Sequence, residues 1–430
     1  MKHYYFLIVI AALMMACQPS ADQQLAKQIQ QDSILQQVKA KALEVVKTGF
    51  NAGDGYGEVW IRDYNTFIEL SAEVYPKEIL KENLLVFFRL QGEDGNIIDG
   101  FIPQSKAVQT KGGYQYIYTD LEPTYCGHKN TVETDHETSL VQAVYKYVTK
   151  TGDRAFLGEK VGTKTTAERL EWSMEFLLNH RWSDEYGLIW GATTADWGDV
   201  QHCHPWGVYI TDDTKYCLDI YDNAMLLIAL DNLMKLIPST MEKWSPIRDS
   251  IAKNTMKHLW DEKNQKFIPH VYLEDSPFPE DFNENEIYYH GGTAVAIEAG
   301  LLNKAQIKTA LDKMVKNVNA SGAGSIGLTL YPPYPQGSFE NKGMYPYGYQ
   351  NGGDWTWFGG RMIQQLIKNG FVHEAYEQAL PMMQRVIDNA GFFEWYTIDN
   401  KPEGSGTFRG SAGVLYTTIE QFERWSEEHQ

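Results

Sequence analysis

The sequence predicts an all-α protein folded as an (α/α)6 toroid, which is a ring of six helical hairpins. Apolar residues recur with helical periodicity along most of the chain, and no low-complexity or Ser/Gly-rich linker divides it. Long connections also alternate with short ones. A chain of 430 residues is long for one ordinary domain, but it suits twelve helices and six long loops without a second sizeable domain.

The first predicted helix spans residues 22–47, where Leu25, Ile29, Leu35 and Val38 form part of one apolar stripe. Eleven further helices are expected from the same periodicity. They should begin near Tyr64, Lys77, Glu133, Thr166, Cys217, Thr240, Gly292, Asn303, Asp354, Phe371 and Gly410.

Local signals support several of these boundaries. Thr165 and Glu168 have the spacing of a capping box, and Asn303 is a suitable cap for the helix that follows it. Pro381 lies inside a predicted helix and should kink or split it.

The connections between helices indicate where a site should lie. Links after every second helix are mostly short, whereas the other links are long. The long loops span 49–63, 92–132, 181–216, 261–291, 319–353 and 390–409. In a ring of hairpins all six lie on one face, so we expect the functional site there. The loop 92–132 could contain short strands.

The N-terminus has the features of an export signal. Lys2 and His3 precede an apolar run over residues 4–16, which is too short to span a membrane as a helix. The segment ending at Cys17 resembles a bacterial lipobox, although an ordinary signal cut nearby is the alternative. We therefore expect a signal peptide at 1–16, a lipid tether at 17–21 and a single domain at 22–430. This implies a lipoprotein of the outer membrane, facing the periplasm or the cell surface, that contacts the membrane only through acylated Cys17.

Composition limits the possible partners. The formal net charge of −18 excludes a nucleic-acid partner, and 12 Trp with 26 Tyr favour a neutral polyol or sugar. The three cysteines after Cys17 allow at most one disulfide. The triplets 126–128 and 202–204 contain Cys and His, but their spacing is too tight for an ordinary zinc site. We expect no metal, no cofactor and a monomer.

Carboxylates, aromatic rings and glycines are concentrated in the long loops and at the helix starts that follow them. This combination suits a sugar pocket, because rings stack on apolar sugar faces and carboxylates bind hydroxyl groups. The segments concerned are 58–63, 133–137, 194–199, 221–223, 349–357, 392–396 and 404–409.

These segments resemble the six-hairpin glycosidase superfamily, which includes glucoamylases, trehalases, neutral invertases and processing α-glucosidases. Residues 60–63, with the sequence Trp-Ile-Arg-Asp, match a W-x-R-D motif of glucoamylase-like enzymes. Residues 196–199, with the sequence Asp-Trp-Gly-Asp, resemble the segment that carries the general acid. Residues 394–396, with the sequence Glu-Trp-Tyr, resemble the segment that carries the general base.

The resemblance implies an exo-acting glycoside hydrolase that inverts configuration at an α-linkage of a glucoside-type oligosaccharide. Asp199 is the expected general acid, with Asp196 as the second choice, and Glu394 is the expected base. The expected substrate-binding residues are Trp60, Arg62, Asp63, Glu137, Trp197, Asp222, Tyr349, Asp354, Trp355, Trp357, Trp395 and Arg409.

Structural roles remain open for several of these residues. Asp196 or Asp199 could serve a turn, Glu137 could be a helix-start acid, and Asp354 could be a cap. Other functions on the same fold are a phosphorylase, an unsaturated-uronyl hydrolase, or an epimerase acting through histidines such as His136, His204 and His290. A non-catalytic glycan-binding lipoprotein is the alternative from a different class.

Overall fold

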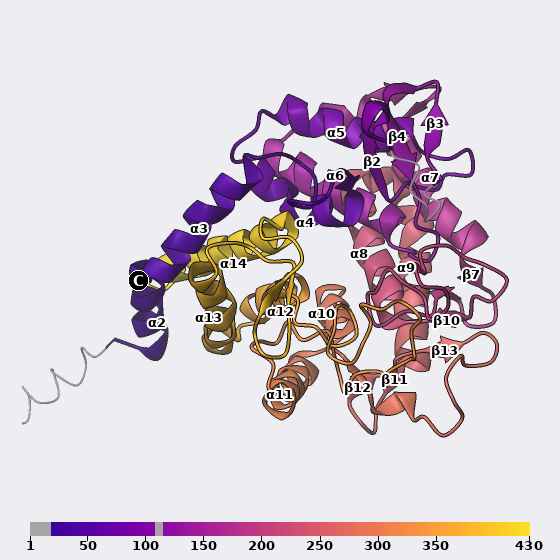
Figure 1. The fold of residues 1–430 in the computed structure, drawn as a ribbon. Coiled ribbons are helices and arrows are strands. Elements are labelled where there is room, and N and C mark those ends of the chain that lie inside the picture. The colour runs from indigo at the N-terminus through magenta and orange to yellow at the C-terminus, as the bar shows by residue number, and fades with distance from the viewer. Residues whose placement is uncertain (1–18, 108–114) are drawn as a thin grey trace, which may run out of the picture.

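The computed structural model describes residues 19–107 and 115–430. The predicted signal peptide and Cys17 lie outside the described residues. Within them the chain forms two concentric rings of helices (Figure 1). The predicted (α/α)6 toroid is therefore confirmed.

The inner ring contains six helices, each packed against two others in the order α4–α6–α8–α10–α12–α14 and back to α4. The inner helices are α4 (Ile61–Ser71), α6 (His136–Thr151), α8 (Ile220–Leu236), α10 (His290–Glu298), α12 (Thr356–Lys368) and α14 (Arg409–Glu428). The outer helices are α2 (Ala21–Gln31), α3 (Ser33–Val46), α5 (Lys77–Arg89), α7 (Thr166–His180), α9 (Met241–His258), α11 (Lys304–Ser321) and α13 (Val372–Asp388).

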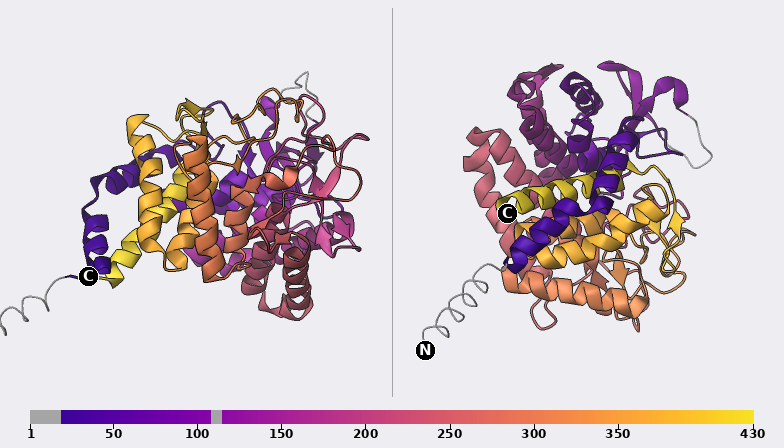
Figure 2. Two further views of the ribbon diagram at one scale, coloured as in Figure 1. Left: turned by 90° about the horizontal axis from the view of Figure 1, so that it is seen from below. Right: turned by 90° about the vertical axis from the view of Figure 1, so that its left-hand side faces the viewer.

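Every inner helix follows an outer helix through a long loop, so the inner helices run parallel and begin at the same end of the ring. Figure 2 shows the loops gathered at that end. Parallel helices place the positive ends of their dipoles together. Acidic side chains lie in the first turns there, including Asp63, Glu137 and Asp222. The C-terminal turns carry compensating cations, such as Lys235 and Lys368.

Short strands occupy the long loops, as suggested for 92–132, where most of a four-stranded antiparallel sheet forms in the order β1-β2-β4-β3. Those strands are β1 (Val59–Trp60), β2 (Gly100–Pro103), β3 (Ile117–Thr119) and β4 (Glu122–His128). The other strands are β5 (Lys160–Val161), β6 (Lys164–Thr165), β7 (Trp182–Ser183), β8 (Leu188–Ile189), β9 (Gly191–Ala192), β10 (Tyr216–Leu218), β11 (Trp260–Asp261), β12 (Lys266–Phe267), β13 (Val271–Tyr272), β14 (Tyr288–Tyr289), β15 (Leu330–Tyr331), β16 (Trp395–Tyr396) and β17 (Pro402–Glu403).

The predicted helix starts lie within three residues of the observed ones. The continuous first helix was wrongly predicted, and the structure excludes one of the two alternatives given for Pro381. The helix predicted over 22–47 is split into α2 and α3, because the side chain of Asp32 accepts a hydrogen bond from Ile34 N (2.8 Å) and starts a new helix. Pro381 does not split α13, which continues through it with Met382 and Met383 fully buried. Packing of this face outweighs the missing hydrogen bond.

The ring closes where the first and last hairpins meet. The main-chain N–H of Arg409 donates to Ala52 O (2.8 Å). Asp54 accepts hydrogen bonds from Ser405 Oγ, from Thr407 N (3.0 Å) and from Thr407 Oγ1 (2.8 Å). The bonds from Ser405 and Thr407 lower the pKa of Asp54 to about 2. We call this contact between residues 51–54 and 405–409 the closing clasp.

Two negative findings concern the described part of the chain. The cysteines at 126, 203 and 217 are all free thiols within it. None of its helices is both long and apolar enough to cross a membrane.

Candidate active site

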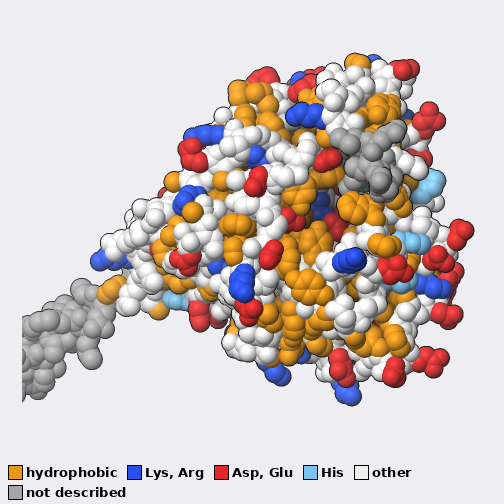
Figure 3. All heavy atoms as spheres, in the orientation of Figure 1, with side chains coloured by type: hydrophobic (Ala, Val, Ile, Leu, Met, Phe, Trp, Pro, Cys, Tyr) orange, Lys and Arg blue, Asp and Glu red, His pale blue; other side chains and the backbone are white. Residues whose placement is uncertain are grey.

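A cavity of about 420 Å³ opens at the loop end of the ring. Figure 3 shows the surface hollowed near its centre, with hydrophobic and charged side chains around the hollow. The lining comes from five of the six long loops and from the first turns of inner helices. Its residues are Ala52, Tyr56, Trp60, Arg62, Asp63, Asp99, His128, Asn130, Glu133, Trp197, Asp199, Val200, Trp206, Val208, Asn341, Gly343, Tyr349, Gln350, Trp355, Trp357, Glu394 and Phe408.

The floor of the cavity is centred on Arg62 at the start of α4. Its guanidinium donates to Asp135 Oδ2 (2.7 Å) and pairs with Glu133. Tyr221 donates a further hydrogen bond to Asp135 Oδ2 (2.6 Å). The arginine is buried and is held on two sides by carboxylates, so its position is fixed before any ligand binds.

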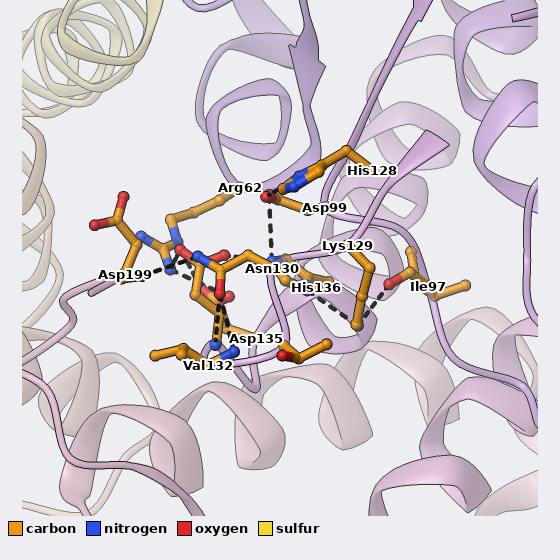
Figure 4. Close-up of polar contacts among 12 residues, drawn as sticks. Arg62, Ile97, Asp99, His128, Lys129, Asn130, Val132, Asp135, His136 and Asp199 are labelled. Atoms are coloured by element: carbon orange, nitrogen blue, oxygen red, sulfur yellow. Dashed lines mark hydrogen bonds and ion pairs between the residues drawn. The ribbon is translucent and has the colours of Figure 1, made fainter. Parts of the chain in front are cut away.

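Asp99, Lys129 and His136 form a second set of polar side chains near Arg62 and Asp135 (Figure 4). His136 Nε2 contacts Glu133 and lies 3.3 Å from Asp99. Lys129 Nζ lies 3.0 Å from His136 Nδ1. Burial and the charge of Lys129 oppose protonation of His136, but Asp99 and Glu133 together raise its pKa to about 9. Burial raises the pKa of Glu133 to about 7, with Arg62 acting against the shift.

Asp99, Glu133 and His136 are close enough for one atom of each to ligate a metal ion. In the structure Oε1 of Glu133 pairs with Arg62 and Oε2 contacts His136, so these groups form an ion-pair network. The zinc candidates considered from the sequence are engaged elsewhere. Cys126 contacts Ile102 O and Cys203 contacts Gln201.

Asp63 and Asp199 present open carboxylate oxygens to the cavity. Oδ1 of each is buried and has no hydrogen-bond partner within the described residues. Burial raises the pKa of both carboxyl groups, and the positive charge of Arg62 opposes the shift. The backbone of Asp199 is fixed by Gln350, which accepts from its N–H (3.2 Å), and by Asn130, which donates to its carbonyl oxygen (2.9 Å).

Glu394 enters the cavity from the last long loop. Tyr56 Oη lies 2.9 Å from both carboxylate oxygens and can donate to either one, and Ser405 N donates to Oε2 (3.2 Å). Burial raises the pKa of Glu394, the two donors lower it, and the charge of Asp199 raises it. Gly404 has φ of +69°, and a Cβ at this position would collide with Oε2 of Glu394. Glycine is therefore required for the backbone to approach the carboxylate.

Aromatic rings form the walls of the cavity. Trp197 packs against Trp355 and Trp357, with ring centroids 4.8 and 5.7 Å apart. The indole Nε1 atoms of Trp60, Trp197 and Trp357 are buried and have no acceptor within the described residues. These donors complement the open acceptors of Asp63 and Asp199, so the cavity could bind a ligand rich in hydroxyl groups.

The structure brings nine of the predicted site residues into the lining of one cavity. They are Trp60, Arg62, Asp63, Trp197, Asp199, Tyr349, Trp355, Trp357 and Glu394. Six others lie outside this lining, and their contacts explain why.

Asp196 is not placed to act as the acid. Its backbone has φ of +55°, and its carboxylate accepts hydrogen bonds from Gly291 N (2.7 Å) and Gly292 N (2.8 Å) at the start of α10. It therefore anchors a helix N-terminus. Asp222 and Asp196 both line a second, much smaller space next to Arg62, and neither lines the main cavity.

The remaining four residues support the loops. Glu137 accepts from Ile97 N and Lys129 Nζ, each at 2.8 Å. Asp354 is held by Arg385 and by Ser325 Oγ (2.7 Å). The last two of these four residues lie at the edges of the site. Trp395 lies behind Tyr349, and Arg409 donates to Asn51 O (2.7 Å) in the closing clasp.

Several lining residues were missed from the sequence, above all Tyr56, Asp99, His128, Asn130 and Trp206. His128 is brought beside Asp99 because β2 and β4 pair with Gly100 opposite His128. This register depends on a strand pairing across 28 residues, which no local motif indicates. Tyr56 lies among glycines and polar residues and carries no motif.

The double ring, with paired acids and tryptophans in one cavity at its loop end, defines a six-hairpin glycosidase. The catalytic-domain model of the glycosyl hydrolase 94 superfamily matches residues 20–377. The chain belongs to this superfamily and is a glycoside hydrolase.

Solved structures of similar fold come from other glycosidase families. The GH63 mannosylglycerate hydrolase of Thermus thermophilus in complex with glucose has 15% identity and a TM-score of 0.61, covering 88% of this chain and 100% of its own. The rhamnosidase of Klebsiella oxytoca with rhamnose bound has 13% identity and a TM-score of 0.58, covering 91% of this chain and 64% of its own. At such identities the likeness establishes the fold. No curated protein matches the sequence.

Proposed function

We propose that the protein removes terminal sugars from a neutral, α-linked glucoside-type oligosaccharide with inversion of configuration. The observation that carries the proposal is that Asp199 and Glu394 enter one cavity from loops of different hairpins. In an inverting enzyme the two carboxyl groups must be far enough apart for a water molecule to fit beside the sugar. Loops that meet across a ring can provide that separation.

Asp199 is the proposed general acid. Burial raises the pKa of Asp199 and so favours its protonated form, and its carboxyl group lines the cavity, where it can pass a proton to the glycosidic oxygen as the bond to the leaving group breaks. Glu394 is the proposed base. The donors from Tyr56 and Ser405 favour its ionised form, which takes a proton from water as the water oxygen attacks the anomeric carbon.

The shape of the cavity supports exo action. Its inner end is closed by the buried charges of Arg62, Asp99 and Glu133, so that the terminal sugar would meet the floor. The alternatives have less support. Within the described residues, His136, His204 and His290 all lie outside the cavity lining, and Arg409 is paired in the closing clasp. Neither a histidine pair nor a phosphate cradle is therefore available from the residues first considered for them.

The test compares three variants on a panel of α-gluco-, α-manno- and β-linked disaccharides. Asp199→Asn and Glu394→Gln should each lower kcat by at least a thousandfold while the fold and sugar binding persist. Asp196→Asn is the matched control. It should remain active but lose about 2 kcal/mol of unfolding free energy, because the amide can accept only one of the two hydrogen bonds at α10. Anomer formation is followed by proton NMR.

Activity that survives in Asp199→Asn but not in Asp196→Asn would contradict the acid assignment. A product of retained configuration would contradict inversion, and full activity in both Asp199→Asn and Glu394→Gln would refute the hydrolytic site.

We also propose that the enzyme is exported and tethered through acylated Cys17. The support is the positive tip, the short apolar run and the lipobox-like segment before Cys17 in the sequence.

A further inference from the structure

Trp206 is an exposed aromatic residue at the mouth of the cavity. It is 47% exposed, whereas Trp197, Trp355 and Trp357 in the same lining are buried. Because Trp206 also lines the cavity, a ligand that fills the open end would contact its ring. The residue belongs to the long loop between α7 and α8, which also carries Asp199.

Backbone hydrogen bonds hold Trp206 close to the proposed acid. Gln201 N donates to Gly207 O (2.9 Å), which closes the loop just after Asp199. Thr131 N donates to Val208 O (3.1 Å), and Glu340 N donates to His202 O (3.0 Å). The tip of the loop is therefore fixed to two neighbouring loops, and Trp206 is placed on the side of the acid.

The proposed base belongs to a different part of the ring. Glu394 comes from the loop before α14, and Tyr56 from the loop before α4. In an inverting reaction the acid protonates the leaving group, whereas the base holds water on the opposite face of the sugar. A residue fixed to the acid loop at the open end therefore meets the leaving group.

The residues that share the exposed part of the lining with Trp206 include uncharged ones. Val208, Asn341 and Gly343 all line the cavity and keep some solvent exposure. We propose that Trp206 is the stacking platform for a neutral leaving-group sugar, with Asn341 beside it as a hydrogen-bonding partner. This assignment rests on the proposed hydrolysis. It identifies the leaving-group sugar as the part of the substrate that the open end of the cavity recognises.

The experiment separates leaving-group recognition from bond cleavage. Trp206→Ala and Trp206→Phe are compared with the wild type on maltose and on α-D-glucopyranosyl fluoride, or on the corresponding disaccharide and fluoride of whichever sugar the panel identifies. The fluoride presents the same terminal sugar without a leaving-group ring. Tyr118→Ala is the matched control, because Tyr118 is an exposed aromatic residue on β3 outside the lining.

Trp206→Ala should lower kcat/KM for the disaccharide about three- to tenfold, as expected for the loss of one ring contact, and should leave the fluoride unchanged. Trp206→Phe should recover most of the loss, and Tyr118→Ala should match the wild type on both substrates. Equal losses on the two substrates, or no loss on the disaccharide, would overturn the platform while the proposed hydrolysis stands. Failure of the wild type to cleave any fluoride or disaccharide would instead refute the hydrolysis itself.

Discussion

Replacement of Tyr56 by Phe tests how the base is kept ionised. The phenol oxygen lies 2.9 Å from both carboxylate oxygens of Glu394, while Ser405 N supplies a second donor at 3.2 Å. The substitution removes only the hydroxyl group and leaves the ring in the wall of the cavity. Glu394 then keeps one donor in a buried setting, with Asp199 still opposing its charge.

The size of the effect follows from the bond that is lost. A hydrogen bond to a charged group contributes about 1.5 to 3 kcal/mol. Because it stabilises the ionised form, its removal raises the pKa of Glu394 further. A base must be ionised to act, so the acid limb of the kcat/KM profile should move to higher pH. At a pH below that limb, activity should fall by about tenfold or more, with a smaller loss above it.

The assay is the pH dependence of kcat/KM on the substrate that the panel identifies. Tyr75→Phe is the matched control, because it removes a tyrosine hydroxyl that donates to Lys47 O (2.8 Å) outside the cavity. It should leave the acid limb in place. An acid limb in Tyr56→Phe that coincides with the wild type, or that lies at lower pH, would refute this account of the base.

Gly404→Ala should lower kcat by about tenfold or more, because the added Cβ would press on Oε2 of Glu394. Gly300→Ala is the control. Gly300 also has a positive φ, of +75°, but open space around it, so this variant should have similar backbone strain without loss of activity in the folded enzyme. Equal kcat in the two variants would contradict a steric effect on the base. Cys17→Ser should abolish incorporation of labelled palmitate and move the protein from the membrane to the soluble fraction of a bacterial host. Cys203→Ser is the control and should keep the label, and an unchanged membrane fraction in Cys17→Ser would refute the tether.

The ring was predictable because apolar spacing and loop length are local properties. The sequence also pointed to Asp199 and Glu394, the proposed acid and base, because both stand among aromatic residues in long loops, and the structure places both in the lining of one cavity. The choice between Asp196 and Asp199 was harder, because only Trp197 and Gly198 separate them. The left-handed backbone at Asp196 turns its carboxylate onto α10, and sequence carries no direct sign of that turn.

Other features depend on contacts between distant segments. Asp32 could be a helix-interior acid in the sequence, and only its hydrogen bond to Ile34 N marks the break. Asp99 and His128 meet through strand register, and Tyr56 reaches Glu394 across 338 residues of sequence. Residue periodicity determines neither strand register nor the closure of the ring.

The closing clasp bears on the stage of synthesis and folding at which the active site is assembled. Tyr56 is synthesised early and Glu394 late, and in the folded protein they meet beside the contact between residues 405–409 and residues 51–54. The acid loop and the floor belong to hairpins that can form earlier, as N-terminal segments do during synthesis. A chain that ends before residue 405 would therefore lack the contacts that position the proposed base. On the proposed mechanism, turnover requires that the first and last hairpins have joined.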